Sequence, residues 1–204
     1  MAYLVLVRHG ESTWNKVGAW TGLTDISLDE EGKNTARKDG QFLKDIAFDL
    51  AYTSSLRRAQ ETLKLIKIEI GKEGLPVIEN MALDERDYGD FTGKNKYELE
   101  KEYGEEQFLK WRRGWDEKIP RGETLKDVYK RAVPYYQGHI LKDLRSGKNV
   151  LVVAHGNSLR ALVKYIENIS DEDIPKLELA TGEIYIYQMD PQGQILSKEI
   201  KVVS

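Results

Sequence analysis

Two short apolar runs, each followed by a histidine, stand out in the pattern of hydrophobic and polar positions. The first spans residues 3–7 and leads into Arg8, His9 and Gly10, and the second spans residues 150–154 and leads into His155 and Gly156. Uninterrupted apolar runs of this length are typical of strands that are buried on both faces of a parallel sheet. The pattern therefore predicts two buried strands, each with a histidine and a glycine just past its carboxyl end.

The rest of the pattern alternates between helices and strands. Helical spacing of apolar residues predicts helices over about 28–43, 56–70, 96–115, 124–144 and 159–166. Shorter runs predict strands over 48–53, 75–78, 183–189 and 195–203, the last at an edge, with a short helix or turn over 171–177. Strands that alternate with helices predict an α/β fold, here a three-layer α/β/α sandwich with a mostly parallel central sheet.

Local signals refine the predicted helices. Residues 27–30 have the pattern of a capping box, and Ser54 and Ser55 are N-cap candidates for the helix over 56–70. Pro134 lies inside the helix over 124–144 and should kink it. His139, in the same helix, is expected to be an ordinary helix residue.

Composition narrows the class of protein. With 204 residues, 40% of them hydrophobic, the chain can bury one sizeable core, so a single domain over 1–204 is expected. The formal net charge of −3 argues against nucleic acid and membrane surfaces as partners, but not against a small basic pocket. The absence of cysteine excludes a disulfide framework, a thiol nucleophile and a Cys-based metal site. The apolar run at the N-terminus is too short for a signal peptide and no segment could span a bilayer, so a cytoplasmic protein is expected.

The two matching histidines are the first candidates for chemistry. If the strands before them are parallel and adjacent, His9 and His155 face each other across a crevice at the carboxyl edge of the sheet, where ligands of open α/β sheets bind. The chain has only three histidines, so two in matching positions are informative. The helix that begins near Gly156 and Asn157 would present free backbone amides to an anion there.

Arginines near the same edge favour a phosphate ligand, because guanidinium groups match phosphate oxygens. Arg8 precedes the first histidine, and Arg58 lies in the first turn of the helix that follows another strand end. Its neighbour Arg57 is expected to point elsewhere. Spacing alone predicts that Arg112 and Arg113 are surface residues.

Together these residues favour phosphoryl transfer. A neutral imidazole among cations is a competent nucleophile towards phosphorus, because nearby positive charge disfavours the imidazolium. The reaction also needs in-line positioning, cations around the transferring oxygens and a proton donor for the leaving alkoxide. Glu85 is the best candidate for that donor, because its segment, residues 84–93, follows a strand and is expected at the rim of the crevice.

The motifs and their order resemble the histidine phosphatase superfamily. The matching segments are residues 8–15 (RHGESTWN), 21–22 (TG), 53–59, 83–89, 111–113 (WRR) and 154–161 (AHGNSLRA), which together span nearly the whole chain. Arg-His-Gly alone marks only the superfamily. The pair Arg112 and Arg113, Lys96 after Asn95, and residues 155–161 are similar to the cofactor-dependent phosphoglycerate mutases within it.

The resemblance implies a reaction and roles for the matched residues. The enzyme would interconvert 3-phosphoglycerate and 2-phosphoglycerate in glycolysis and gluconeogenesis, primed by 2,3-bisphosphoglycerate as cofactor and without a metal, so its partners would be small phosphorylated metabolites. His9 would be the phosphohistidine nucleophile and Glu85 the proton donor and acceptor, while Arg8, Arg58 and His155 would bind the transferring phosphoryl group. The substrate-binding residues that the resemblance implies are Arg8, Gly10, Glu11, Ser12, Asn15, Thr21, Gly22, Arg58, Glu85, Tyr88, Lys96, Arg112, Arg113, Gly156 and Asn157.

Two segments depart from the mutase pattern. Mutases of this type usually read Asn-Glu-Arg-His-Tyr-Gly-Ala-Leu-Gln-Gly, whereas this chain has Asp87, Asp90 and Phe91 in place of His, Ala and Leu. These side chains are expected to put negative charge and bulk near the anion site, which leans towards the phosphatase branch. The segment between Arg113 and Glu123 is also shorter than in long mutases, so water should be excluded less well and hydrolytic side activity should be higher.

Three other interpretations stay open. A phosphatase of small phosphate esters on the same fold, the serious rival, would share the histidines and Glu85 but would not need Lys96, Arg112 and Arg113. A metal enzyme could use the two histidines and Glu85 as a ligand triad. A non-catalytic sensor of phosphometabolites would have no need of Glu85. The sequence shows no interface, so a homo-oligomer also stays open.

Overall fold

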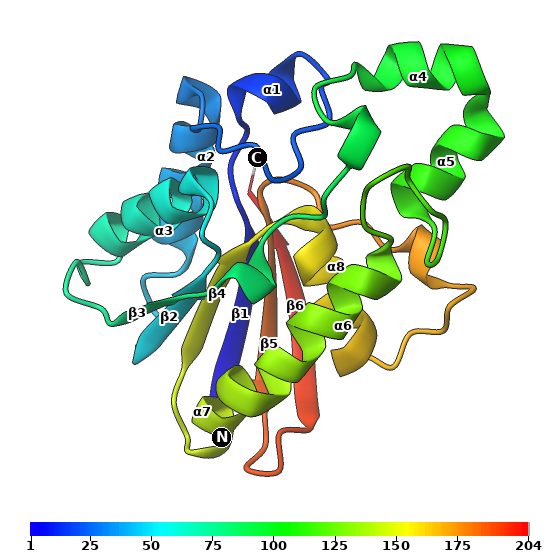
Figure 1. Cartoon of the computed structure of the whole chain (residues 1–204). Coiled ribbons are helices and arrows are strands. Elements are labelled where there is room, and N and C mark those ends of the chain that lie inside the picture. Colours follow the sequence, from blue (N-terminus) through cyan, green and yellow to red (C-terminus); the bar gives the residue numbers. More distant parts are fainter. Residues whose placement is uncertain (204) are drawn as a thin grey trace.

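The computed structural model describes residues 1–203. They fold around one central six-stranded sheet (Figure 1). The strands are β1 Ala2–Arg8, β2 Leu50–Thr53, β3 Val77–Glu79, β4 Val150–Ala154, β5 Glu183–Met189 and β6 Ile195–Val202. Their order across the sheet is β3-β2-β4-β1-β5-β6. The first four in this order are mutually parallel, whereas β5 is antiparallel to β1 and β6 is antiparallel to β5. The predicted α/β class and the mostly parallel sheet are confirmed.

Helices cover both faces of this sheet. The α-helices are α1 Thr13–Lys16, α2 Glu30–Phe42, α3 Arg57–Glu69, α4 Lys96–Tyr103, α5 Glu105–Arg113, α6 Leu125–Tyr135, α7 Leu141–Arg145 and α8 Gly156–Ile166. Short 3₁₀ segments are η1 Met81–Leu83, η2 Gly89–Phe91 and η4 Ile174–Lys176, and η3 Tyr136–Ile140 is a π-helical segment. In Figure 1, α2 and α3 lie on one side of the sheet and α6, α7 and α8 on the other.

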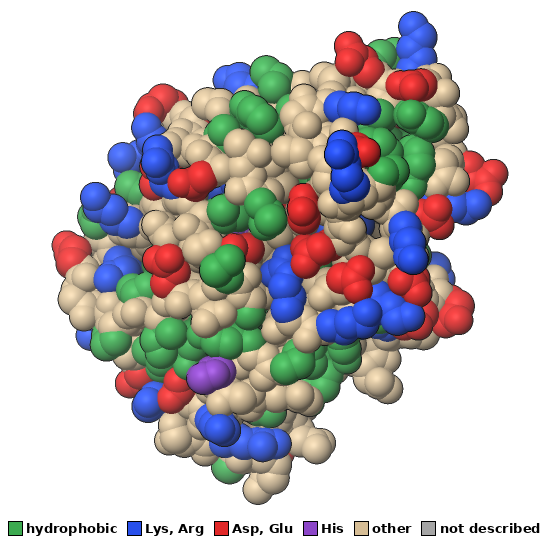
Figure 2. Space-filling model, viewed as in Figure 1, with side chains coloured by type: hydrophobic (Ala, Val, Ile, Leu, Met, Phe, Trp, Pro, Cys, Tyr) green, Lys and Arg blue, Asp and Glu red, His purple; other side chains and the backbone are tan. Residues whose placement is uncertain are grey.

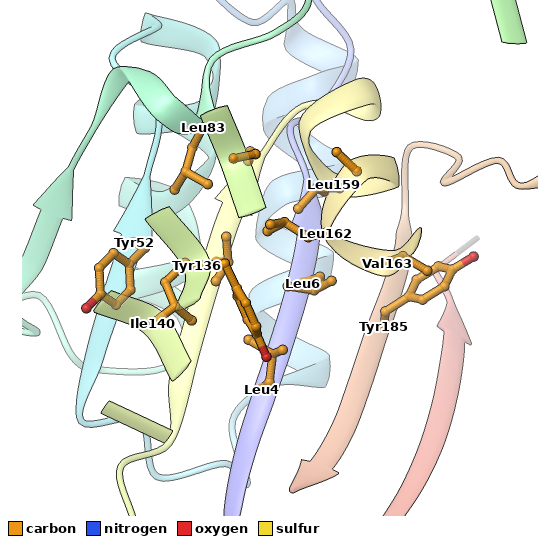
Figure 3. Close-up of a cluster of buried hydrophobic side chains, with 14 of the residues drawn as sticks. Leu4, Leu6, Tyr52, Leu83, Tyr136, Ile140, Leu159, Leu162, Val163 and Tyr185 are labelled. Atoms are coloured by element: carbon orange, nitrogen blue, oxygen red, sulfur yellow. The ribbon is translucent and has the colours of Figure 1, made fainter. Parts of the chain in front are cut away.

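The two faces of β1 explain why the sheet has two cores. Because successive side chains of a strand point to opposite faces, Leu4 and Leu6 pack with residues of α6 and α8, whereas Val5 and Val7 pack with residues of α3. Figure 3 shows the first of these cores, where Leu6 lies near Leu162 of α8 and Leu4 lies farther along β1, near Tyr136. Burial on both faces is what the uninterrupted apolar run predicted.

Helices α4 and α5 extend beyond the carboxyl edge of the parallel strands, at the upper right of Figure 1. A third cluster of buried side chains holds them there, made of Trp20, Phe91, Leu99, Phe108, Trp111 and Ile119. The rings of Phe91 and Trp111 lie 4.8 Å apart in an edge-to-face arrangement, which aromatic pairs prefer. The aromatic cluster therefore attaches α5 to the loops that surround the strand ends.

Several predicted limits of helices and strands were wrong. The helix expected over 28–43 begins at Glu30, because Asp29 and not Ser27 caps it by accepting from the amide of Gly32. Ser54 and Ser55 do not cap α3, which has Leu56 at its N-cap position without a side-chain hydrogen bond. The strand expected over 75–78 is β3 at 77–79.

The two long helices predicted in the middle of the chain are both interrupted. The helix expected over 96–115 divides into α4 and α5 at Gly104, whose φ of 84° is a conformation that glycine adopts readily. The helix expected over 124–144 continues from α6 through η3 into α7, and the π-helical segment begins two residues after Pro134. Proline lacks the amide that would bond one turn back, and the winding changes just after Pro134, whereas the predicted kink itself stays a prediction. His139 lies in η3 and is exposed, as an ordinary helix residue should be.

The surface carries charges of both signs. On the face shown in Figure 2, basic and acidic side chains are interspersed, and neither sign forms a broad patch. Among residues 1–203, no helix is both long enough and apolar enough to cross a membrane.

Candidate active site

The two histidines lie side by side at the carboxyl edge of the sheet. β1 and β4 are adjacent and parallel with Arg8 opposite Ala154, so the residue that follows each strand reaches the same place. The ring centroids of His9 and His155 are 4.9 Å apart, and both side chains are buried. The predicted juxtaposition is confirmed.

The loop after His9 is held between α2 and α3 by very close packing. A Cβ atom on Gly10 would lie 2.3 Å from the carbonyl oxygen of Gly32 in α2, which is too close for any side chain. On its other side, the amide of Gly10 donates to the hydroxyl of Thr62 in α3 at 3.1 Å. Both contacts fix the backbone that carries His9.

Hydrogen bonding selects one tautomer of His9. Its Nδ1 lies 2.6 Å from the carbonyl oxygen of Gly10, which can only accept, so Nδ1 carries the hydrogen. Nε2 then has a free lone pair and accepts from Nε of Arg58 at 3.3 Å. Burial, followed by the charges of Arg58 and Arg8, holds the pKa of His9 well below the usual histidine value of 6.5. The imidazole is therefore neutral near pH 7, with Nε2 available for attack.

His155 is held by a serine from the neighbouring strand end. Its Nε2 lies 2.6 Å from the hydroxyl of Ser54, which directly follows β2. Its Nδ1 is buried and has no hydrogen-bond partner among residues 1–203. Burial, and after it the charge of Arg58, also lowers the pKa of His155 well below 6.5. This side chain has an unused polar atom next to His9.

The side chain of Arg58, in α3, is held by carbonyl oxygens of the loop beside the crevice. Nη1 and Nη2 donate to the carbonyl oxygens of Thr24 and Gly22 at 2.9 and 2.8 Å, and Nε points to the first histidine. The side chain is 1% exposed, and burial lowers its pKa from the usual arginine value. Arg57 instead forms an ion pair with Asp25 at the surface, as predicted.

Glu85 uses one carboxylate oxygen for the protein and leaves the other for a ligand. Oε1 accepts from the amides of Arg86 at 2.8 Å and Asn157 at 3.2 Å. The amide of Asn157, expected to be free for an anion, therefore holds the carboxylate instead. Oε2 lies close to Gly156, where an added Cβ would approach it to 3.7 Å.

The crevice has two adjoining compartments. The histidine compartment is lined by Arg8, His9, Asn15, Thr21, Gly22, Arg58, Glu85, Tyr88 and Lys96. The arginine compartment is lined by Arg8, Trp20, Glu85, Tyr88, Lys96, Arg112, Arg113, Gly156, Asn157, Arg160, Leu177, Glu178 and Leu179. Arg8, Glu85, Tyr88 and Lys96 line both, so one ligand can extend from one compartment into the other.

Cations crowd the region where the compartments meet. Burial, and then the charges of Arg112 and Arg8, lower the pKa of Lys96. A lysine destabilised by neighbouring cations favours an anionic ligand, because the ligand relieves the repulsion. Arg112 and Arg113 thus line a cationic compartment. Arg112 is exposed and Arg113 is partly exposed, as the interpretation from spacing expected, but spacing did not show that both face the crevice.

Three implied substrate-binding residues do not line either compartment. Gly10 packs against the backbone of Gly32 and donates its amide to Thr62. Ser12 is buried and donates from its hydroxyl to the side-chain oxygen of Asn15 at 2.7 Å, so it positions a residue that does line the histidine compartment. Glu11 lines a separate surface hollow with Glu30 and Glu31. A direct substrate contact was expected for these residues, and the structure instead gives them supporting or distant positions.

The three side chains that differ from the mutase pattern, Asp87, Asp90 and Phe91, also lie outside the two compartments. Asp87 accepts from the amide of Gly89 at 2.8 Å, and Asp90 forms an ion pair with Arg121. Phe91 is buried in the aromatic cluster beneath α5. The expectation that these side chains bring negative charge and bulk to the anion site was wrong, because each is turned towards neighbouring loop or core residues.

Some residues in or beside the compartments were not predicted as site residues. Arg160 follows Asn157 by three residues on α8 and donates to its side-chain oxygen at 3.0 Å, so helical spacing could have identified it. Ser54 was expected as a helix cap and instead binds His155. Glu178 lies in the irregular segment before β5, where no sequence pattern marked it.

The metal interpretation lacks a suitable donor set. Among residues 1–203, no group of three or more His, Asp or Glu side chains is arranged to hold a metal ion. The two histidines and Glu85 therefore do not form the ligand triad considered above.

Comparisons with known proteins agree with this geometry. Residues 4–199 match the family model of the histidine phosphatase superfamily, branch 1. The 2,3-bisphosphoglycerate-dependent phosphoglycerate mutase of Bradyrhizobium diazoefficiens is 51% identical over 197 residues, which cover 96% of this chain and 95% of the relative. The protein of the same name from Parvibaculum lavamentivorans is 45% identical, with coverage of 98% and 96%.

Solved structures show the same fold. A mycobacterial glucosyl-3-phosphoglycerate phosphatase aligns over 100% of both chains with a TM-score of 0.84, at 23% identity. Bacillus stearothermophilus YhfR aligns with a TM-score of 0.81 at 28% identity, over 96% of this chain and 94% of that one. The family match over nearly the whole chain, the paired histidines at the strand ends and the shared fold agree: the chain belongs to the histidine phosphatase superfamily, branch 1.

Proposed function

We propose that this protein is a 2,3-bisphosphoglycerate-dependent phosphoglycerate mutase, which interconverts 3-phosphoglycerate and 2-phosphoglycerate in glycolysis and gluconeogenesis. Relatives that carry this name are 45–51% identical over nearly the whole chain. The structural observation that carries the proposal is the joining of the histidine compartment to a second cationic compartment. Hydrolysis of a simple phosphate ester needs only the first, whereas a phosphoglycerate has a phosphate and a carboxylate to place.

The first step uses the lone pair on Nε2 of His9. This nitrogen attacks phosphorus, a new N–P bond forms, and the bond between phosphorus and the ester oxygen breaks. Oε2 of Glu85, when protonated, gives its hydrogen to the leaving alkoxide. Phosphorylated His9 then gives the group to the free hydroxyl of 3-phosphoglycerate, and Glu85 accepts the hydrogen from that hydroxyl. His9 next takes the phosphoryl group at the other position, which leaves 2-phosphoglycerate and restores the phosphohistidine.

Fixed donors surround the transferring group. Arg8 and Arg58 supply positive charge that needs no rearrangement when negative charge grows on the phosphoryl oxygens. The hydroxyl of Ser54 accepts from the amide of Leu56 at 3.2 Å and has its own hydrogen to donate to Nε2 of His155. Neutral His155 then carries its hydrogen on Nδ1, which has no hydrogen-bond partner within residues 1–203, and donates it to the phosphoryl group.

The residues present fit the proposed cofactor. 2,3-Bisphosphoglycerate has three anionic groups, and the two compartments together offer Arg8, Arg58, Lys96, Arg112 and Arg113 as cationic partners. When bound, it supplies the phosphoryl group that charges the first histidine. Lys96 and the arginine pair hold the remaining anionic groups. Tyr88 and Asn157, joined by a 2.9 Å hydrogen bond, line the same compartment.

The proposal also defines the partners and the location of the protein. Its ligands are small phosphorylated metabolites, and a glycolytic role places it in the cytoplasm. The phosphatase alternative loses part of its sequence argument, because Asp87, Asp90 and Phe91 lie outside the compartments.

A coupled assay from 3-phosphoglycerate to 2-phosphoglycerate, with and without added 2,3-bisphosphoglycerate, tests the proposal. We expect turnover that depends on the primer. A protein that releases phosphate from 3-phosphoglycerate but forms no 2-phosphoglycerate at any primer concentration would be a phosphatase instead.

A further inference from the structure

The arginine compartment contains a carboxylate that the proposed reaction does not use. Glu178 lies in the irregular segment between η4 and β5 and lines this compartment. The carbonyl oxygen of Leu177 accepts from Nε of Arg160 at 3.0 Å, and that of Leu179 accepts from Nη1 of Arg8 at 2.8 Å. The backbone on both sides of Glu178 is therefore hydrogen-bonded to arginines of the crevice, which fixes the position of its Cα atom.

From this position the carboxylate of Glu178 reaches the arginine pair at the end of α5. One oxygen lies 2.5 Å from Nη2 of Arg113, and the other lies 3.8 Å from Nη2 of Arg112. Burial alone would raise the pKa of Glu178, but the hydrogen bond from Arg113 and the charges of Arg113, Arg112 and Arg8 outweigh it and lower the pKa. The carboxylate is ionised and faces the same guanidinium groups that an anionic ligand would use.

This ion pair is accessible rather than buried. The side chains of Arg112, Arg113 and Glu178 are 43%, 25% and 47% exposed. Ion pairs with this degree of exposure are weak, because water and salt screen them. A ligand with its own anionic group can therefore displace the carboxylate from the arginines.

We propose that the carboxylate of Glu178 is an internal competitor for Arg112 and Arg113, which a ligand's second anionic group must displace before the arginine compartment is filled. The inference rests on the proposed function, because it takes that second group to be the carboxylate or second phosphate of a phosphoglycerate. Competition of this kind weakens the binding of ligands with two anionic groups and speeds their release. A ligand whose single anionic group is held in the histidine compartment is unaffected.

Two ligands that differ at one group test this inference. 3-Phosphoglycerate and glycerol 3-phosphate share a three-carbon skeleton and a phosphate, but only the first has a carboxylate. Their dissociation constants are measured by calorimetry for the wild-type protein, for Glu178→Gln, and for the control Glu172→Gln. The control removes the same charge from an exposed residue that does not line the crevice.

We expect Glu178→Gln to bind 3-phosphoglycerate about three- to tenfold more tightly at low salt, the range that two exposed ion pairs represent. The gain should shrink as salt screens the charges, and glycerol 3-phosphate and the control should change less than twofold. In the mutase assay, KM for 3-phosphoglycerate should fall by the same factor while kcat changes less than twofold.

Unchanged or weaker binding of 3-phosphoglycerate by Glu178→Gln would overturn the inference, and weaker binding would mean that Glu178 orients the arginines. If both ligands bound more tightly by the same factor, the inference would also be overturned, because the gain would then come from the change in net charge and not from the arginine pair. Absence of mutase turnover in the wild-type protein, together with selective tightening, would refute the proposed function and leave the competition intact.

Discussion

The hydroxyl of Ser54 lies 2.6 Å from Nε2 of His155, and this contact joins the carboxyl ends of β2 and β4. Ser54 lines neither compartment, yet its hydroxyl holds the ring of the second histidine beside His9. The site therefore depends on a positioning residue whose sequence neighbourhood suggested only a helix cap.

Ser54→Ala should lower kcat about fivefold, because a neutral hydrogen bond of about 1 kcal/mol would no longer hold His155 in place. KM should change less than twofold, since Ser54 does not contact the ligand. Ser55→Ala is the matched control, because the hydroxyl of Ser55 binds Asp84 instead. Equal losses of kcat in the two variants would contradict a specific role for Ser54.

Labelling with 2,3-bisphosphoglycerate that carries radioactive phosphorus tests the nucleophile. His9→Ala should give no acid-labile phosphoenzyme, because the nitrogen that accepts the phosphoryl group is gone. His155→Ala should leave a trace, because the nucleophile and the arginines remain. Retention of label by His9→Ala would disprove the assignment.

The buried histidines should make stability fall in mild acid. Their pKa values in the folded state are lowered mainly by burial, so the unfolded chain takes up protons first as the pH drops below about 6.5. Each histidine then removes up to about 1.4 kcal/mol of unfolding free energy per pH unit, until its own folded-state pKa is reached. Above pH 6.5 both contributions to stability are complete.

Urea unfolding at pH 7.5, 6.5 and 5.5 measures this effect. His9→Gln should reduce the loss of stability between pH 6.5 and 5.5, whereas the exposed control His139→Gln should leave it unchanged. An identical pH dependence in wild type and His9→Gln would rule out the proposed burial effect.

The buried carboxyl group of Asp39 should make stability fall as the pH rises, which is opposite to the effect of the histidines. This residue of α2 is fully buried, and neither of its carboxylate oxygens has a hydrogen-bond partner among residues 1–203. Burial raises its pKa to about 7. The folded state therefore keeps a proton that the unfolded chain has lost, and the resulting stability is complete below about pH 4 and lost as the pH rises through 7.

Asp39→Asn should remove this dependence, because its amide has no charge to bury. The variant should gain about 1–4 kcal/mol of unfolding free energy relative to wild type between pH 4 and pH 8. Denaturant curves at both pH values measure the difference, with the exposed Asp45→Asn as control. A difference between variant and wild type that is the same at both pH values would refute the prediction.

The short segment between Arg113 and Glu123 should permit hydrolysis beside mutase turnover. Less coverage of the crevice leaves water able to reach the phosphohistidine. Phosphate release from 2,3-bisphosphoglycerate, measured beside mutase turnover in the same preparation, gives the ratio. Undetectable hydrolysis would reject the prediction.

The parts of the site that lie next to strands were predictable from sequence. The apolar runs of β1 and β4 fixed where His9 and His155 lie, because parallel neighbours end at the same edge. Arg58 followed from the same logic, since it lies in the first turn after β2.

The parts that depend on tertiary packing were not predictable in this way. Arg112 and Arg113 face the crevice because Trp111 is anchored in the aromatic cluster, and helical spacing cannot show which way such a helix is held. Their inclusion came only from the resemblance. Glu178 belongs to an irregular segment positioned by two arginines that are distant in sequence, so no local pattern identified it.

The order of the sheet also bears on how the protein is made. β1 lies between β4 and β5, so the strand that leads to His9 finds its partners about 150 residues later, beginning with Leu4 opposite Val150. At a synthesis rate of about 5–20 residues per second, the first strand leaves the ribosome several seconds before either partner exists. Contacts so far apart in sequence form slowly. The loop that carries His9 is thus translated well before the strand that brings His155 beside it, and the site is completed only after both are present.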